Sequence, residues 1–216
     1  MDHNKLIAQA AKAVLEPMGL FRKGRSRVWI DDNGWFFTVV EFQPSGYSKG
    51  VHLNAAVNFL WSRADHLTYD FYDGTSSRTE NFVSYDGDDD AFLDQMLSFA
   101  HAAAERVTEY RKLKDFRTAK KCILPYKPKV IPALYDKVML CGLTQSRWTK
   151  IYYRRLLKNI EHSGYDLRAL REELSNEIGP VINDREKCQN YVLSRIHAQR
   201  AFWRAQPNMA AMKEIR

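Results

Sequence analysis

The sequence lacks the features that mark most membrane, secreted and disulfide-bonded proteins. No apolar run approaches the roughly 18 residues of a membrane span. The opening stretch, MDHNKLIAQAAKAVLEP, is amphipathic and has neither the apolar core nor the cleavage site of a secretory signal. Cys122, Cys141 and Cys188 are odd in number, far apart and without CxxC spacing. We therefore expect a cytoplasmic protein with no disulfide framework and no metal site, whose cysteines pack as small apolar side chains.

Catalytic and nucleotide-binding motifs are also missing. Ser45-Gly46 does not belong to a GxSxG elbow, and neither HExxH nor DxDxD occurs anywhere in the chain. No glycine-rich loop joins a strand to a helix, as the binding of a nucleotide phosphate would require. We expect no cofactor, and the sequence favours a binding protein over an enzyme.

Charge is plentiful and unevenly distributed. Residues 1–110 hold 10 Lys and Arg against 16 Asp and Glu, a net charge of −6. Residues 111–216 hold 23 against 10, a net charge of +13, so the total of +7 conceals two halves of opposite sign. A basic half indicates an acidic partner, which could be another protein, a nucleic acid or the chain's own first half.

The first half has the pattern of a helix, an antiparallel sheet and a second helix. Apolar residues spaced by three and four predict helices over 3–16 and from about 88 to 114. Between them lie segments rich in β-branched and aromatic residues, which predict strands over 26–31, 35–43, 51–61 and 66–72. Asn33-Gly34 predicts a hairpin between the first two strands. The turn-forming residues of 44–50 favour a plain hairpin loop over a ligand-binding loop.

The second half reads as helices only. Amphipathic segments predict helices over 131–141, 145–162 and 166–178 and a last long helix from about 183. Lys127-Pro128 indicates a turn-like break, so the domain boundary is expected between 115 and 129. The predicted fold class is α+β: an antiparallel meander packed against helices in residues 1–115, followed by an all-helical basic domain in residues 129–216.

Short segments of the first half resemble a bacterial family, domain of unknown function 4304. They are Leu15–Gly24 (LEPMGLFRKG), Phe42–Ser45 (FQPS) and Leu53–Val57 (LNAAV), and the resemblance covers roughly residues 5–110. Pro44 stands where the family commonly has a basic residue, and Ala56 where it commonly has glycine. The family has no assigned reaction, so the resemblance implies a bacterial origin and no particular activity. It also leaves open a role beside defence or toxin-related systems, which no residue of this chain indicates.

One face of the predicted sheet is polar and could form a small-ligand or acid–base site. Fixed strands would hold donors in place, and histidine titrates near neutral pH. His52 or His66 beside a carboxylate would give such a site its acid–base pair, and the pairing of His52 with Asp70 assumes one particular strand register. Water-facing side chains of a half-exposed sheet are the simpler interpretation. The candidate residues are Glu41, Gln43, His52, Asn54, Asn58, His66 and Asp70.

A basic surface is the second candidate site. Helical steps of about 100° align Arg147, Lys150, Arg154 and Lys158 on one face, with Trp148, Tyr152, Leu156 and Ile160 opposite. Arg200 and Arg204 add a second cluster on the last helix. We therefore expect a cytosolic bacterial interaction module that binds an acidic macromolecule through its helical half. An acidic protein is favoured over a nucleic acid, and an enzyme or small-ligand binder using the polar sheet face remains the other alternative.

Overall fold

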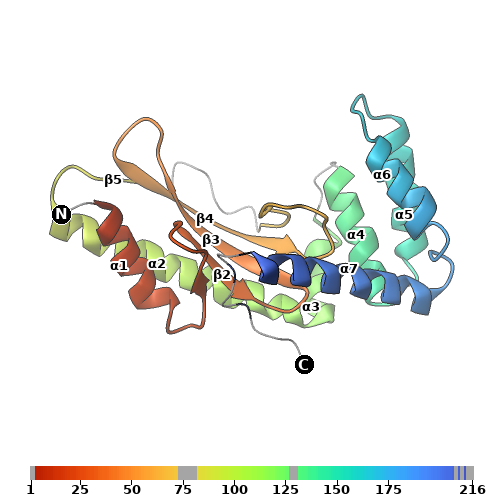
Figure 1. Cartoon of the computed structure of the whole chain (residues 1–216), viewed down its shortest axis with the longest axis horizontal. Helices are drawn as coiled ribbons and strands as arrows, with labels where there is room; N and C mark the ends of the chain where they lie inside the picture. Colours follow the sequence, from red (N-terminus) through yellow and green to blue (C-terminus); the bar gives the residue numbers. More distant parts are fainter. Residues whose placement is uncertain (1–2, 73–81, 127–130, 207–208, 210–211, 213–216) are drawn as a thin grey trace. The chain divides into compact units, whose positions relative to one another are not determined.

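The structure, a computed structural model, describes residues 3–72, 82–126, 131–206, 209 and 212 (Figure 1). The chain divides into two compact units. The first unit comprises residues 1–58, 64–114 and 202–216, and the second comprises residues 59–63 and 115–201. The expected boundary lay between 115 and 129. The expected break at Lys127-Pro128 falls outside the described residues.

The first unit is the expected α+β fold. Helix α1 (His3–Leu15) comes first, and a sheet follows that has five strands among the described residues. After the sheet come helix α2 (Asp89–Arg111) and a short 3-10 turn, η1 (Lys112–Lys114). The strands are neighbours in sequence order, as in a meander. They are β1 (Phe21–Arg22), β2 (Val28–Asp32), β3 (Phe36–Pro44), β4 (Gly50–Phe59) and β5 (Phe82–Ser84).

Local sequence explains the two connections beside β3. At the β2–β3 hairpin Asp32 pairs with Phe37, and Gly34 takes a φ of 89°, which confirms the turn predicted from Asn33-Gly34. The loop between β3 and β4 closes through a hydrogen bond from the Ser45 N–H to the Gly50 carbonyl, at 3.0 Å. Gly50 is required there, because an added Cβ would lie 2.6 Å from the Val83 carbonyl oxygen of β5.

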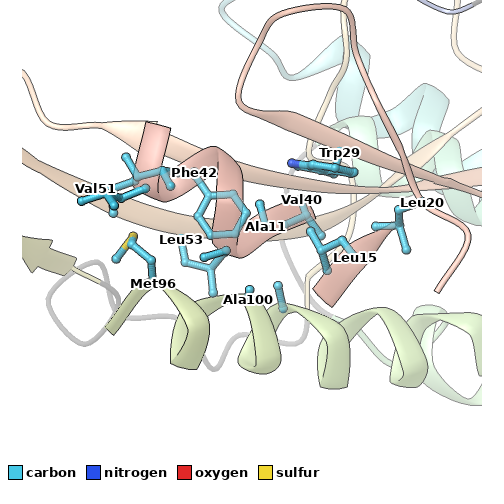
Figure 2. Close-up of a cluster of buried hydrophobic side chains, with 14 of the residues drawn as sticks. Ala11, Leu15, Leu20, Trp29, Val40, Phe42, Val51, Leu53, Met96 and Ala100 are labelled. Carbon is cyan, nitrogen blue, oxygen red and sulfur yellow. The ribbon is translucent and has the colours of Figure 1, made fainter. Parts of the chain in front are cut away.

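The core of the first unit lies between one sheet face and the two helices. Figure 2 shows Trp29, Val40, Phe42, Val51 and Leu53 pointing from the strands toward α1 and α2. The helices contribute the apolar stripes expected from their spacing, including Ala11, Leu15, Met96 and Ala100. Asp88 caps α2 by accepting hydrogen bonds from the Asp90 and Ala91 N–H groups. The predicted cover of the apolar sheet face by these two helices is confirmed.

Two expectations for the secondary structure are wrong, one in the first unit and one at the start of the second. Residues 66–72 do not form a strand: they contact β4 through an isolated bridge between Phe71 and Val57. The described strand next to β4 is instead β5. Helix α3 (Phe116–Ile123) occupies a segment from which no helix was expected. Its sequence, FRTAKKCI, is short, but it places Ala119 and Ile123 one helical turn apart on a buried face, and Asp115 caps its start by accepting a hydrogen bond from the Thr118 N–H.

The second unit is helical, as expected. After α3 it contains α4 (Ile131–Leu143), α5 (Thr149–Glu161), α6 (Arg168–Glu173), a π-helical turn η2 (Leu174–Ile178) and most of α7 (Arg185–Ala205). Helices α4 and α5 pack against each other, and Leu156 and Ile160 are the buried apolar residues of α5. No helix among the described residues is long and apolar enough to span a membrane.

Residues 59–63 belong to the second unit because their side chains bond to its helices. The Trp61 indole N–H donates to Oδ1 of buried Asp136 on α4, at 2.8 Å. Arg63 donates to both carboxylate oxygens of Glu177 on η2. From α7, Arg195 donates to the Trp61 carbonyl at 3.2 Å. A five-residue segment that continues directly from β4 therefore completes the helical core.

Candidate functional site

The polar sheet face does not converge on one point. Near the β3–β4 loop, the Asn54 amide donates to Oε1 of Gln43 at 2.8 Å. Glu41 accepts a hydrogen bond from the Tyr69 hydroxyl at 2.6 Å. These side chains satisfy one another in the manner of an ordinary sheet surface.

The remaining residues of that face lie apart from this group. His52 pairs with Phe82 of β5, with ring centroids 4.7 Å apart. Asp70 lies next to Val57 and Asn58 instead, where its N–H donates to the Val57 carbonyl at 2.9 Å. The predicted pairing of His52 with Asp70 is therefore wrong, because β4 separates the two residues by about six residues, or roughly 20 Å of strand.

Asn58 and His66 also depart from the prediction. The side chain of Asn58 is buried and accepts a hydrogen bond from the Thr68 N–H at 3.1 Å, so it holds the loop against β4. His66 is exposed beside Asp65, its sequence neighbour, at 3.0 Å. Among the described residues, no group of three or more His, Cys, Asp and Glu side chains is placed to hold a metal ion.

The basic side chains that begin at the turn before α5 do share a surface. We call Arg147, Lys150, Arg154 and Lys158 the basic stripe. All four are exposed, and none pairs with a carboxylate within the described part of the chain. The only acidic residue of α5 is Glu161, its last residue. The stripe is thus an uncompensated positive surface of the second unit.

The spacing of the basic stripe works against the stability of its own helix. Lys150, Arg154 and Lys158 follow one another at i, i+4, so each neighbouring pair repels by about 0.2–0.5 kcal/mol. Arg147 and Lys150 also lie at the N-terminal end, where the helix dipole is positive and cations are unfavourable. Helix α2 has the opposite charge at its N-terminal end, where Asp89 and Asp90 stand in the first turn. The charges of the stripe therefore add nothing to the stability of α5 through pairing within the described part of the chain.

Other cations of the second unit do have internal roles. Arg63 pairs with Glu177, and the Arg171 guanidinium donates to the Ile160 carbonyl at 3.1 Å. Lys137 is buried and donates to the Tyr126 carbonyl, and burial lowers its pKa. The basic composition of this half therefore includes structural cations as well as those of the stripe.

The second predicted cluster is not a common surface. Arg200 is only 5% exposed, so its expected role in partner binding is wrong. A long side chain on a helix packs its methylene groups against neighbours when it falls on the apolar face. Arg204 is exposed, but it belongs to the first unit.

Exposed apolar side chains lie beside the basic stripe. Trp148 was expected on the face opposite the basic residues; it is 46% exposed, and the Arg147 guanidinium lies 5.3 Å from its ring centroid. Each step of four residues turns about 40° round the helix, so Trp148 lies roughly 80° from buried Leu156. Ile151 is also exposed, at 37%. Tryptophan and arginine are the residues most enriched at binding hot spots.

Comparison of the chain with protein-family models, curated proteins and solved structures gives no match. The expected bacterial family therefore stays a prediction.

Proposed function

We propose that this chain is an interaction module that binds an acidic macromolecule through the basic stripe and the exposed Trp148 and Ile151 beside it. The observation that carries the proposal is the stripe itself: four exposed cations without carboxylate partners among the described residues, two of which, Arg147 and Lys150, stand at the unfavourable positive end of α5. An external acidic surface would convert this repulsion into attraction, and it would also raise the rate of association.

An acidic protein surface is the partner we favour. Ile151 is aliphatic and exposed beside the stripe, and a side chain of this kind gains from contact with another protein's apolar atoms. Trp148 and Arg147 would then form the anchoring pair, with Lys150, Arg154 and Lys158 as the charged surroundings.

A nucleic acid is the second candidate, and Trp148 is the observation that supports it. An exposed indole next to several cations can stack on a base of a single strand while the cations neutralise phosphates. If all four cations of the stripe contacted DNA phosphates, log affinity would fall against log salt with a slope of about −3 to −4. Weak salt dependence would rule this candidate out.

Charge reversal tests the proposal. A variant with Arg147, Lys150, Arg154 and Lys158 changed to Glu should lose at least about tenfold in affinity for an acidic partner. The probes are a polyglutamate peptide, a short DNA strand, and the proteins and nucleic acids recovered from the native host on the wild-type chain. The matched control changes the same number of exposed cations outside the stripe to Glu: Lys5, Lys49, Arg117 and Lys121. Equal loss in both variants would contradict the proposed surface.

A further inference from the structure

A small cavity opens where the turn between α4 and α5 meets the start of α7. Its volume is about 160 Å³, and all of its lining residues belong to the second unit. Most of the lining is polar: Gln145, Ser146, Arg147, Thr149, Lys150, Asn183 and Arg185, with Gly142, Ile182 and Cys188 completing the walls. A cavity of this size is smaller than the roughly 300–1,000 Å³ of sites for drug-sized ligands, so it suits a compact group.

Three of the lining side chains are cations, and none is a carboxylate. Arg147 and Lys150 come from the basic stripe, and Arg185 comes from the first position of α7. Arg185 lies between two acidic residues in the chain, Asp184 and Glu186, and neither lines the cavity. Asp184 accepts a hydrogen bond from the Lys187 N–H at 3.1 Å and pairs with the Lys187 ammonium. The cavity therefore gathers positive charge from the turn before α5, from the first turn of α5 and from the start of α7.

The walls of the cavity are held by close contacts. Gly142 lets α4 approach α7, because an added Cβ would lie 2.9 Å from the Cys188 sulfur. Gln145 has a φ of 49°, an unusual value for a residue other than glycine, and its amide donates to Oε1 of Gln189 at 2.7 Å. Gln189 in turn donates to the Leu143 carbonyl at 2.8 Å. The α4–α5 turn is thus bonded to α7, which brings the backbone positions of the cavity's cationic residues together.

We infer that this cavity binds a phosphate dianion, either inorganic phosphate or the phosphoryl group of a monoester. A phosphoryl group carries a charge of about −1.5 to −2 and three strong acceptor oxygens. As a ligand for three cationic side chains it is therefore better matched than a carboxylate group, which has one charge and two oxygens. The first turn of α5, whose start has no side-chain cap, adds the positive end of a helix dipole. The Asn183 amide, which has no hydrogen-bond partner among the described residues, adds a neutral donor.

This inference goes beyond the proposed macromolecular partner and does not require it. The two sites share Arg147 and Lys150, whereas Arg185 belongs to the cavity alone and Arg154 and Lys158 belong to the stripe alone. Substitutions at the unshared residues therefore separate the two proposals.

Titration of the full chain with inorganic phosphate at constant ionic strength tests the inference. Binding is followed by calorimetry and by amide shifts, with sodium chloride and acetate as the control anions. Arg185→Gln should weaken phosphate binding by about tenfold or more, because it removes a charge-assisted donor. The double variant Arg154→Gln, Lys158→Gln should leave phosphate affinity within about twofold, since both residues lie on the stripe outside the cavity. Thermal melts of both variants check that each remains folded.

Each outcome decides the inference. Phosphate binding that depends on Arg185 supports the inference. If phosphoserine binds with the same affinity as inorganic phosphate, the site is assigned to monoesters. If only inorganic phosphate binds, the site is assigned to the inorganic ion. No phosphate binding by the wild-type chain would overturn it. An equal response to acetate, or equal weakening by the Arg154 and Lys158 substitutions, would also overturn it, because either result would indicate diffuse electrostatics. Weaker polyglutamate binding by the Arg154→Gln, Lys158→Gln variant, with phosphate binding intact, would support two separate sites.

Discussion

At the scale of single residues, the arginines of the second unit differ in burial and in hydrogen-bond partners. Arg63 reaches Glu177 and contributes to the fold, and Arg200 is buried. Arg154 extends into water without a carboxylate partner among the described residues. The sequence could indicate that this half is basic, but it could not show which cations are structural, because that depends on the packing of neighbouring helices.

The cysteines show the same dependence on surroundings and give a direct prediction. Cys141 and Cys188 are buried, which confirms their expected packing, and burial raises the pKa of each thiol to about 11. At pH 8 only about 0.1% of such thiols would be thiolate, the reactive form. Cys122 is exposed, contrary to the expectation of a core position. Under native conditions at pH 8 we expect a disulfide reagent to modify one thiol per chain rapidly.

Two controls make this prediction specific. Cys122→Ser should abolish the rapid reaction, and unfolding in guanidinium should expose the full set of three thiols in the wild-type chain. Because both buried thiols have raised pKa values, their slow reaction should accelerate as the pH rises toward 11. Rapid native labelling that persists in Cys122→Ser would contradict the burial of the other two.

At the scale of elements, α5 has its charges in an order that a helix selected for stability alone would avoid. Cations stand at its positive end and Glu161 at its negative end. Its attachment to the unit relies on packing: Leu156 and Ile160 are buried, and the Tyr153 hydroxyl donates to the Leu174 carbonyl at 2.9 Å. Packing on one face allows the other face to carry unfavourable charge.

This arrangement predicts that replacing a cation of the basic stripe near the start of α5 raises the free energy of unfolding, although the proposed binding needs that cation. Lys150→Glu should raise the free energy of unfolding by about 0.5–1 kcal/mol, because it places an acid at the positive end of α5 and removes repulsion with Arg154. Lys158→Glu, in the last turn, should change it by less than about 0.5 kcal/mol, since relief of repulsion is offset by the opposite dipole effect. Urea unfolding followed by circular dichroism measures both. Destabilisation by Lys150→Glu would show that the cation has a structural role.

The elements that sequence reasoning found are those whose signals are local. Helices α1 and α2 follow from apolar spacing, and the β2–β3 hairpin follows from Asn33-Gly34. The composition of residues 66–72 predicts a strand, yet only Phe71 bridges to β4. Strand pairing is a non-local property, so the register that separates His52 from Asp70 could not be obtained from the pattern of either segment.

At the scale of the whole molecule, the division into units does not follow the order of the chain. Residues 59–63 leave β4 and join the helices, whereas residues from Phe202 onward belong to the first unit. A sequence-based boundary near 115 could not include these exchanges, because composition changes gradually whereas contacts involve individual side chains. Trp61 is fully buried, and its indole hydrogen bond to Asp136 makes it a central contact of the second unit.

The role of Trp61 leads to a prediction about unit-specific stability. Trp61→Phe removes the indole donor from the buried Asp136 carboxyl and leaves a gap, which should cost about 2–4 kcal/mol. The loss should fall on the second unit, so amide hydrogen exchange should quicken in α4 and in residues 185–201 while α1 and α2 keep their protection. Tyr165→Ala, at an exposed position of the same unit, should leave exchange unchanged throughout. If Trp61→Phe accelerated exchange equally in α1, α2 and α4, the units would unfold as one, and residues 59–63 would be a link between them rather than a part of the helical core.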